Sequence, residues 1–270
     1  MQDMRKDMKT EKRIPHSSLC KKMQFEVPTS WKELSQEQLH YVVKLLWLYS
    51  EAPDWENRVL MAAMLYFCNI EVVRKTSSGW LCRKRDNNDS FLLNTDLLPS
   101  MMKDIRFLIR PEEMDVRIEK VGKYEAVDFE LQELMFGKYL EAENYYQAFL
   151  LSHDSKRLEA LARILYKVPD GENPAELCDE ILTGTFLWFA AVKNVLAREF
   201  PHFLKPAGGA GKEITRETLV ANMRAQIRLL TKGDVTKQDD ILKHTDTWTA
   251  LAELDALAEE AEQIKKKYGK

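Results

Sequence analysis

The chain has 270 residues, of which 45% are hydrophobic and 31% are charged, and its 40 lysines and arginines nearly balance 43 aspartates and glutamates. This composition is too apolar for a disordered chain, and it lacks the strongly basic balance that is typical of nucleic-acid-binding domains. No apolar run approaches the ~20 residues of a membrane helix, so we expect no membrane association. The cysteines at positions 20, 68, 82 and 178 form no C-x-x-C pair, which favours reduced thiols and a cytoplasmic protein.

Residues 1–22 are predicted to form a disordered basic arm. They carry seven basic and three acidic side chains, net +4, with few apolar residues that could be buried. A more protein-like segment begins at Met23, so either Met1 or Met23 fits as the start of the chain. A basic arm that binds nucleic acid is the functional alternative to a solvated tail.

An N-terminal α+β lobe is predicted over residues 23–130. Ser35-x-x-Gln38 has the form of a capping box, in which each side chain accepts a hydrogen bond from the other residue's backbone N–H. Apolar residues recur at helical spacing after this box, and a second helix is expected over 54–68.

The pattern then changes to that of strands. Residues 71–83 predict a hairpin that turns at Gly79, and 91–93 predict a third strand. Helical spacing returns over 97–109, and a short strand is expected at 116–118. These features predict a small antiparallel hairpin or three-stranded sheet in the N-terminal half.

From residue 131 onward the chain is predicted to be helical, which makes the protein mainly α with helical bundle lobes. A helical lobe over 131–205 is followed by a glycine-rich linker at 206–213 and a C-terminal helical hairpin over 214–270. A capping box is expected at Thr236-x-x-Asp239. The expected helices span 131–151, 155–167, 174–199, 216–231 and 237–267.

No residue pattern predicts catalysis, a metal or a cofactor. The glycine-rich linker fails as a phosphate loop, because Pro206 and Glu213 stand where that loop needs glycine and a hydroxyl residue. The five histidines have no zinc-ligand spacing, so we expect a protein that is not an enzyme.

Two clusters on the helix after residue 131 have both a functional and a structural interpretation. The carboxylates of Glu130, Glu133, Glu141 and Glu143 resemble an acid/base cluster, but their alternation with Lys and Tyr favours a solvated face. The nearby aromatic residues lie at helical spacing with few cations, which favours core packing over stacking on bases. These aromatic residues are Phe136, Tyr139, Tyr146 and Phe149.

The last predicted helix carries a heptad-like seam, in which apolar residues recur at intervals of four and three. Such a seam packs either at home, against a second copy, or on another protein, and the spacing leaves these alternatives open. The seam residues are Ala250, Leu254, Leu257, Ala261, Ile264 and Tyr268. The predicted partner-binding residues are Trp248, Leu251, Leu254, Leu257 and Ile264.

Three segments resemble proteins of phage and prophage tail modules. They are Val27-Pro28-Thr29-Ser30-Trp31-Lys32-Glu33-Leu34-Ser35, Leu134-Met135-Phe136-Gly137-Lys138-Tyr139-Leu140-Glu141-Ala142-Glu143, and Leu229–Thr236 with Trp248-x-x-Leu251-x-x-Leu254. The resemblance implies a chaperone-like tail-assembly protein of the host cytoplasm, which has no catalytic residues and binds a tail structural protein. The alternatives are a virion structural or connector component and a nucleic-acid-binding regulator.

Overall fold

The computed structural model describes residues 26–86, 89–167, 177–204 and 215–268. The predicted arm over 1–22 and the predicted linker over 206–213 lie outside these ranges, so both stay predictions.

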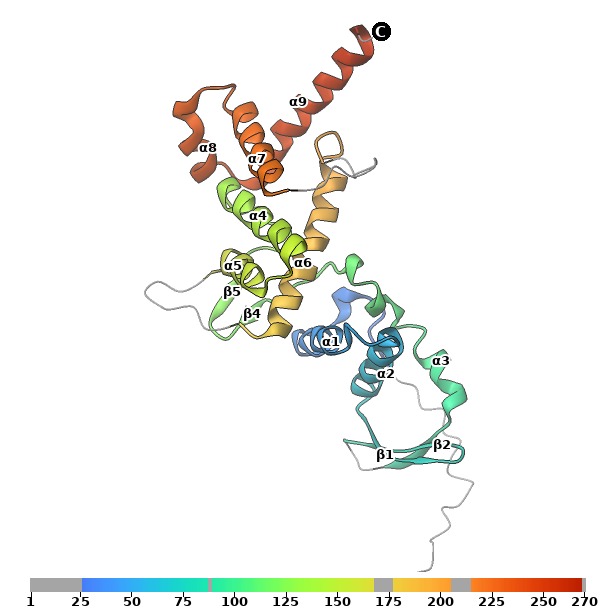
Figure 1. Cartoon of the computed structure of the whole chain (residues 1–270). Helices are drawn as coiled ribbons and strands as arrows, with labels where there is room; N and C mark the ends of the chain where they lie inside the picture. Colours follow the sequence, from blue (N-terminus) through green and yellow to red (C-terminus); the bar gives the residue numbers. More distant parts are fainter. Residues whose placement is uncertain (1–25, 87–88, 168–176, 205–214, 269–270) are drawn as a thin grey trace, which may run out of the picture.

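The described residues form a mainly α structure with two small antiparallel sheets, which confirms the predicted fold class. The long helix α6 runs between the two ends of the molecule, with α1, α2 and the first sheet at one end and α7, α8 and α9 at the other (Figure 1). The helices are α1 (Gln36–Tyr49), α2 (Trp55–Phe67), α3 (Leu98–Met101), α4 (Phe136–Ser152), α5 (Ser155–Leu165), α6 (Asp179–Glu199), α7 (Arg216–Leu230), α8 (Gln238–His244) and α9 (Thr247–Tyr268).

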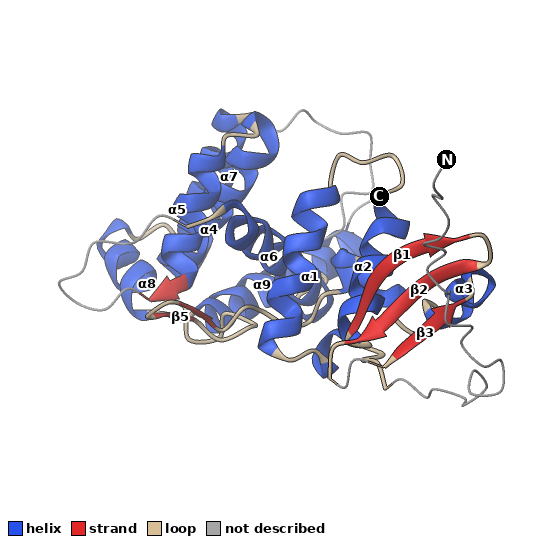
Figure 2. Ribbon diagram, turned by 90° about the horizontal axis from the view of Figure 1, so that it is seen from below, coloured by secondary structure: helices blue, strands red, loops and turns tan. Residues whose placement is uncertain are grey.

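Both sheets have three strands, in the orders β1-β2-β3 and β4-β5-β6, and every neighbouring pair is antiparallel. The first sheet lies at the edge of the molecule beside α3 (Figure 2). The strands are β1 (Ile70–Thr76), β2 (Gly79–Lys84), β3 (Ser90–Leu93), β4 (Lys120–Val121), β5 (Tyr124–Ala126) and β6 (Tyr166–Lys167).

Local signals in the N-terminal half predicted the structure well. The capping box at the start of α1 is present, with Ser35 Oγ accepting from Gln38 N at 3.2 Å and Gln38 Oε1 accepting from Ser35 N at 2.9 Å. The predicted hairpin and third strand form the first sheet. Gly79 begins β2 at a φ of +145°, and a Cβ at this position would collide with the backbone carbonyl of Leu93, so only glycine fits there.

The segment between the two sheets differs from prediction. Residues 97–109 form no continuous helix: the four-residue α3 ends at Met101, and a 3₁₀ turn follows at Arg106–Ile109. Pro99 lies in the first turn of α3, where no intrahelical N–H bond is needed. The strand expected at 116–118 is also wrong. The second sheet instead joins the β4–β5 hairpin to β6, and β6 comes from beyond α5.

Two predicted helix boundaries are wrong. Helix α4 begins at Phe136 rather than 131, because Leu131 adopts a φ of +61° and the Asp128 carboxylate accepts from two backbone N–H groups in the turn. The helix expected over 237–267 is two helices that break at Thr245–Asp246. The capping box at Thr236-x-x-Asp239 is wrong as well, because Asp234 Oδ1 accepts from Thr236 N at 3.0 Å.

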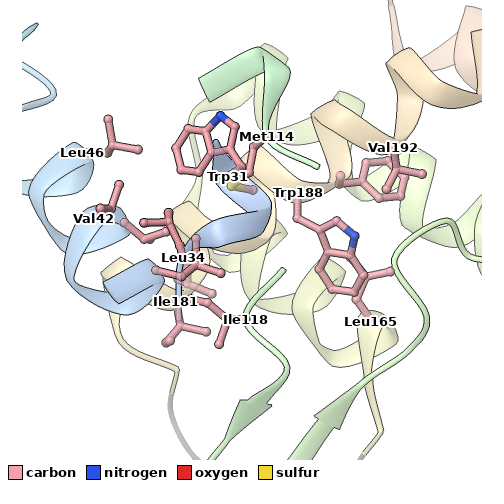
Figure 3. Packing of buried hydrophobic residues seen from close by; sticks show 14 of the residues in the cluster. Trp31, Leu34, Val42, Leu46, Met114, Ile118, Leu165, Ile181, Trp188 and Val192 are labelled. Atoms are coloured by element: carbon pink, nitrogen blue, oxygen red, sulfur yellow. The ribbon is translucent and has the colours of Figure 1, made fainter. Parts of the chain in front are cut away.

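One continuous hydrophobic core joins the parts of the molecule, from Trp31 to Leu254, so the predicted lobes 23–130 and 131–205 share it. Helix α6 is central to this core (Figure 3). Its Ile181 lies near α1, and its Trp188 is 1% exposed and donates from Nε1 to the Phe129 carbonyl at 2.9 Å. A Cβ added to Gly184 would lie 3.2 Å from Val43 Cγ1, so this glycine lets α6 approach α1 closely.

Among the described residues, α6 is the helix that is long and apolar enough to cross a membrane by length and composition. Half of its apolar window is buried inside the molecule, and one such helix is weak evidence for a membrane span, because core helices pass the same test.

Candidate protein-binding surface

Helix α9 is buried in its first half and exposed in its second half. Leu251 and Leu254 are 0% and 1% exposed, whereas Ile264 is 59% and Tyr268 is 72% exposed. Leu257 lies between these extremes and is half-buried. The end of α9 points away from the other helices (Figure 1). We call Leu257, Ala261, Ile264 and Tyr268 the projecting seam.

The first half of α9 is held by contacts on several elements. Trp248 packs edge-to-face on Phe200 with ring centroids 5.3 Å apart, and its Nε1 donates to the Glu130 carbonyl at 2.8 Å. The carboxylate of Asp255 accepts from the backbone N–H groups of His202 and Phe203, each at 2.8 Å. These contacts fix the helix relative to α6.

Burial divides the five predicted partner-binding residues. Leu251 and Leu254 are buried and Trp248 is half-buried against the core, so these three offer a partner little surface. Leu257 and Ile264 stay available on the projecting seam. The heptad spacing could not distinguish the two halves, because the same spacing continues past the point where the neighbouring helices end.

Exposed carboxylates accompany the projecting seam. Residues 253–262 contain five acidic side chains and no basic one, whereas Lys265, Lys266 and Lys267 follow in the last turn of α9. Asp255 and Glu262 face the residues after α6, where a Glu262 oxygen lies 3.5 Å from His202 Nδ1. Glu253 and Glu260 are exposed, form no ion pair with a described residue, and lie two turns apart on one flank of the seam.

A small, mainly apolar cavity of about 110 Å³ lies between α4, α6, α7 and α9. The Glu143 carboxylate pairs there with the Lys193 ammonium, and the two side chains are 22% and 31% exposed. Gln147 Nε2 donates to the same carboxylate oxygen at 2.8 Å, whereas Glu143 Oε2 is buried without a hydrogen-bond partner among the described residues. Burial raises the pKa of Tyr139, which also lines the cavity, and the charge of Glu143 raises it further.

The four carboxylates of the candidate acid/base cluster have separate surroundings. Glu133 lies 3.8 Å from Lys167, Glu141 lies 2.8 Å from Lys138, and Glu130 accepts from Gln132 at 2.8 Å. Glu133 and Glu141 are solvated as expected, but Glu133 precedes α4 and therefore shares no helix face with Glu141. The expected solvated face is wrong for Glu143, which packs against α6 at the cavity.

The aromatic residues of α4 lie in or against the core, as predicted. Phe136, Tyr139 and Tyr146 are buried, and Phe149 packs edge-to-face on Phe186 with centroids 5.4 Å apart. Within the described ranges, no three His, Cys, Asp or Glu side chains are grouped so that they could hold a metal ion.

A second, larger groove of about 420 Å³ lies between α7 and the turn that leads into α8. Arg224 and Arg228 line it one helical turn apart, together with Ile227 and Val235. We call these four residues the basic groove. The groove was not predicted from the sequence, although two arginines at i and i+4 with no acidic residue one turn away from either indicate an unpaired basic face.

The chain matches no known protein family, no curated protein and no solved structure. The residues that carry the resemblance to phage tail modules are packing residues in the fold. Trp31 is buried and packs edge-to-face on Phe107, and a Cβ on Gly137 would lie 2.6 Å from the Leu242 carbonyl oxygen of α8. These contacts explain why such residues are needed, and the family itself stays a prediction.

Proposed function

We propose that the protein acts by binding, as a chaperone-like phage or prophage protein that positions or shields a tail structural protein during assembly. The observation that carries this proposal is the projecting seam, an apolar stripe on a helix whose other half is anchored in the core. An anchored helix presents its exposed half at little cost in conformational entropy, which favours binding.

The chemistry of the seam defines the partner segment that would fit it. Spacing of four and three residues suits one facing helix with an apolar seam of its own. The flanking Glu253 and Glu260 favour a partner helix with basic residues beside that seam. From Leu257 to Tyr268 the seam spans about 17 Å at 1.5 Å per residue, so the partner must also contact further surface to reach a stable interface.

Co-expression with the tail proteins encoded by neighbouring genes tests the proposal. Ile264→Asp should abolish co-purification of one of them, because it places a charge in the middle of the seam. Gln263→Asp adds the same charge at the adjacent exposed position, on another face of α9, and should keep co-purification. Equal behaviour of the two variants, or no co-purifying tail protein, would contradict the proposal.

Mass spectrometry of purified particles separates this function from the alternative of a virion structural or connector component. An assembly chaperone should be absent from the finished particle, whereas a connector should be present in stoichiometric amounts. The remaining alternative, a nucleic-acid-binding regulator, depends on the basic arm over 1–22, which lies outside the described residues.

A further inference from the structure

The basic groove has charges that nothing in the described chain neutralises. Arg224 and Arg228 are exposed, and neither forms an ion pair with a described residue. Two like charges at i and i+4 on a helix repel each other, so an anionic group between them would relieve that repulsion. An occupant of this groove should therefore carry negative charge.

The groove is also apolar. Val235 is 72% exposed, an unusual value for a valine beside a groove, and Ile227 is half-buried next to the arginines. An occupant that covers both kinds of surface must combine carboxylates with aliphatic side chains. The volume of about 420 Å³ suits a few side chains rather than a whole domain.

The middle of α9, ahead of the three lysines of its last turn, has this combination. Glu253 and Glu260 flank the projecting seam, and Leu257 and Ile264 supply aliphatic side chains between and beyond them. In the described residues, neither carboxylate reaches Arg224 or Arg228 of its own chain, since no such ion pair forms. The complementary surfaces are therefore both open within one copy.

We infer that the basic groove of one copy binds the acidic middle of α9, residues 253–262, of a second copy. Because each copy has one groove and one seam, a two-fold arrangement makes both contacts at once and closes the assembly as a dimer. Once one groove–seam contact has formed, the second forms within the same dimer, so both contacts contribute to the binding free energy. The inference goes beyond the proposed function, because it concerns the free protein and holds whether or not a tail protein binds.

A nucleic acid fits the groove less well. The chain has a net charge of −3, and no aromatic side chain lines the groove. Single-stranded nucleic acids are bound by basic surfaces that also carry aromatic residues on which bases stack, and this groove has two arginines without such residues.

Self-association through the seam has a consequence for the proposed function. The dimer covers the surface that we assign to the tail protein, so the partner must compete with the second copy. The free chaperone would then keep its apolar stripe covered until the partner is present.

Light scattering coupled to size exclusion, on the full chain over a range of concentrations, tests the inference. The wild type should be a dimer whose dissociation constant rises at least tenfold between 50 and 500 mM NaCl, because salt screens the charge pairs. The double variants Arg224→Glu/Arg228→Glu and Glu253→Lys/Glu260→Lys should each be monomeric. The double variant Arg74→Glu/Arg106→Glu reverses two exposed arginines elsewhere and should stay dimeric.

Mixing the two monomeric variants provides the decisive result. In the mixed dimer, the reversed groove meets the reversed seam and the native groove meets the native seam, so both contacts are restored. Recovery of a dimer only in the mixture supports the inference, and circular dichroism verifies that each variant is folded. A monomeric wild type, or the absence of a dimer in the mixture, would overturn the inference. If that monomeric wild type also binds a 20-nucleotide single strand through Arg224 and Arg228, the groove binds nucleic acid instead.

Discussion

Replacing Leu254 and Ile264 separately by alanine should have opposite consequences for stability and binding. Leu254 is 1% exposed, and truncating such a buried leucine removes its transfer free energy and leaves a cavity, which together cost about 2–5 kcal/mol. Ile264 is 59% exposed, and a surface substitution of this kind changes the free energy of unfolding by no more than about 0.5 kcal/mol. The two residues lie ten positions apart on one seam, so the comparison isolates burial.

Urea unfolding followed by circular dichroism measures the change in stability, and co-purification with the proposed tail-protein partner measures the change in binding. Leu254→Ala should lower the midpoint at an unchanged slope, whereas Ile264→Ala should leave the midpoint in place and weaken binding. If Ile264→Ala lowered the free energy of unfolding by more than about 2 kcal/mol, the end of α9 would have to pack against its own chain. An unchanged midpoint for Leu254→Ala would refute the burial of the first half.

Three further predictions follow from packing, capping and ionisation. Gly137→Ala should lower the free energy of unfolding by about 1–3 kcal/mol in urea titrations, because the added Cβ would lie 2.6 Å from the Leu242 carbonyl oxygen, and an equally stable variant would contradict this close approach. Asp246→Ala should cost about 1 kcal/mol by thermal unfolding, because the Asp246 carboxylate accepts from Thr249 N at 2.8 Å at the start of α9. The backbone hydrogen bond from Thr249 lowers the pKa of Asp246. The stability difference between Asp246→Ala and the wild type should therefore vanish as pH falls through this lowered pKa. A stability difference that persists in acid would show that the ionised carboxylate is not the cap. Burial raises the pKa of Cys68 from about 9 to about 11, so stability should fall as pH rises between these values and should fall less in Cys68→Ala, and identical alkaline profiles would contradict it.

Local signals determined how much of the fold was predictable. The capping box at Ser35 and the turn at Gly79 involve neighbours within a few residues, and both were read correctly. The second sheet depends on β5 pairing with β6 across the whole of α4 and α5, with only two residues in β6. A two-residue strand is too short to show the alternation of apolar and polar residues, so no local pattern predicts it.

The break between α8 and α9 was missed for a related reason. Phe136 N donates to the Thr245 carbonyl at 2.8 Å, and Thr247 Oγ1 donates to the Leu134 carbonyl at 2.6 Å. Helical propensity alone favours one continuous helix here, and contacts more than a hundred residues away decide otherwise. The same limit applies to the candidate site, where the spacing found the seam but could not show which half the core covers.

An isolated antiparallel β-bridge joins Met135 to Asp246, so backbone hydrogen bonds to the start of α4 hold α9 in place independently of the chain that leads into it. The preceding turn, at Lys232 and Gly233, is exposed and bends through positive φ values of 52° and 82°, which makes it an accessible site for trypsin. A chain cut there would keep α8 and α9 bound through Leu134, Phe136 and the buried Leu254. A separate peptide that contains α8 and α9 should therefore bind the truncated protein and complete its fold. Peptides with different seam residues would then allow one seam to be exchanged for another.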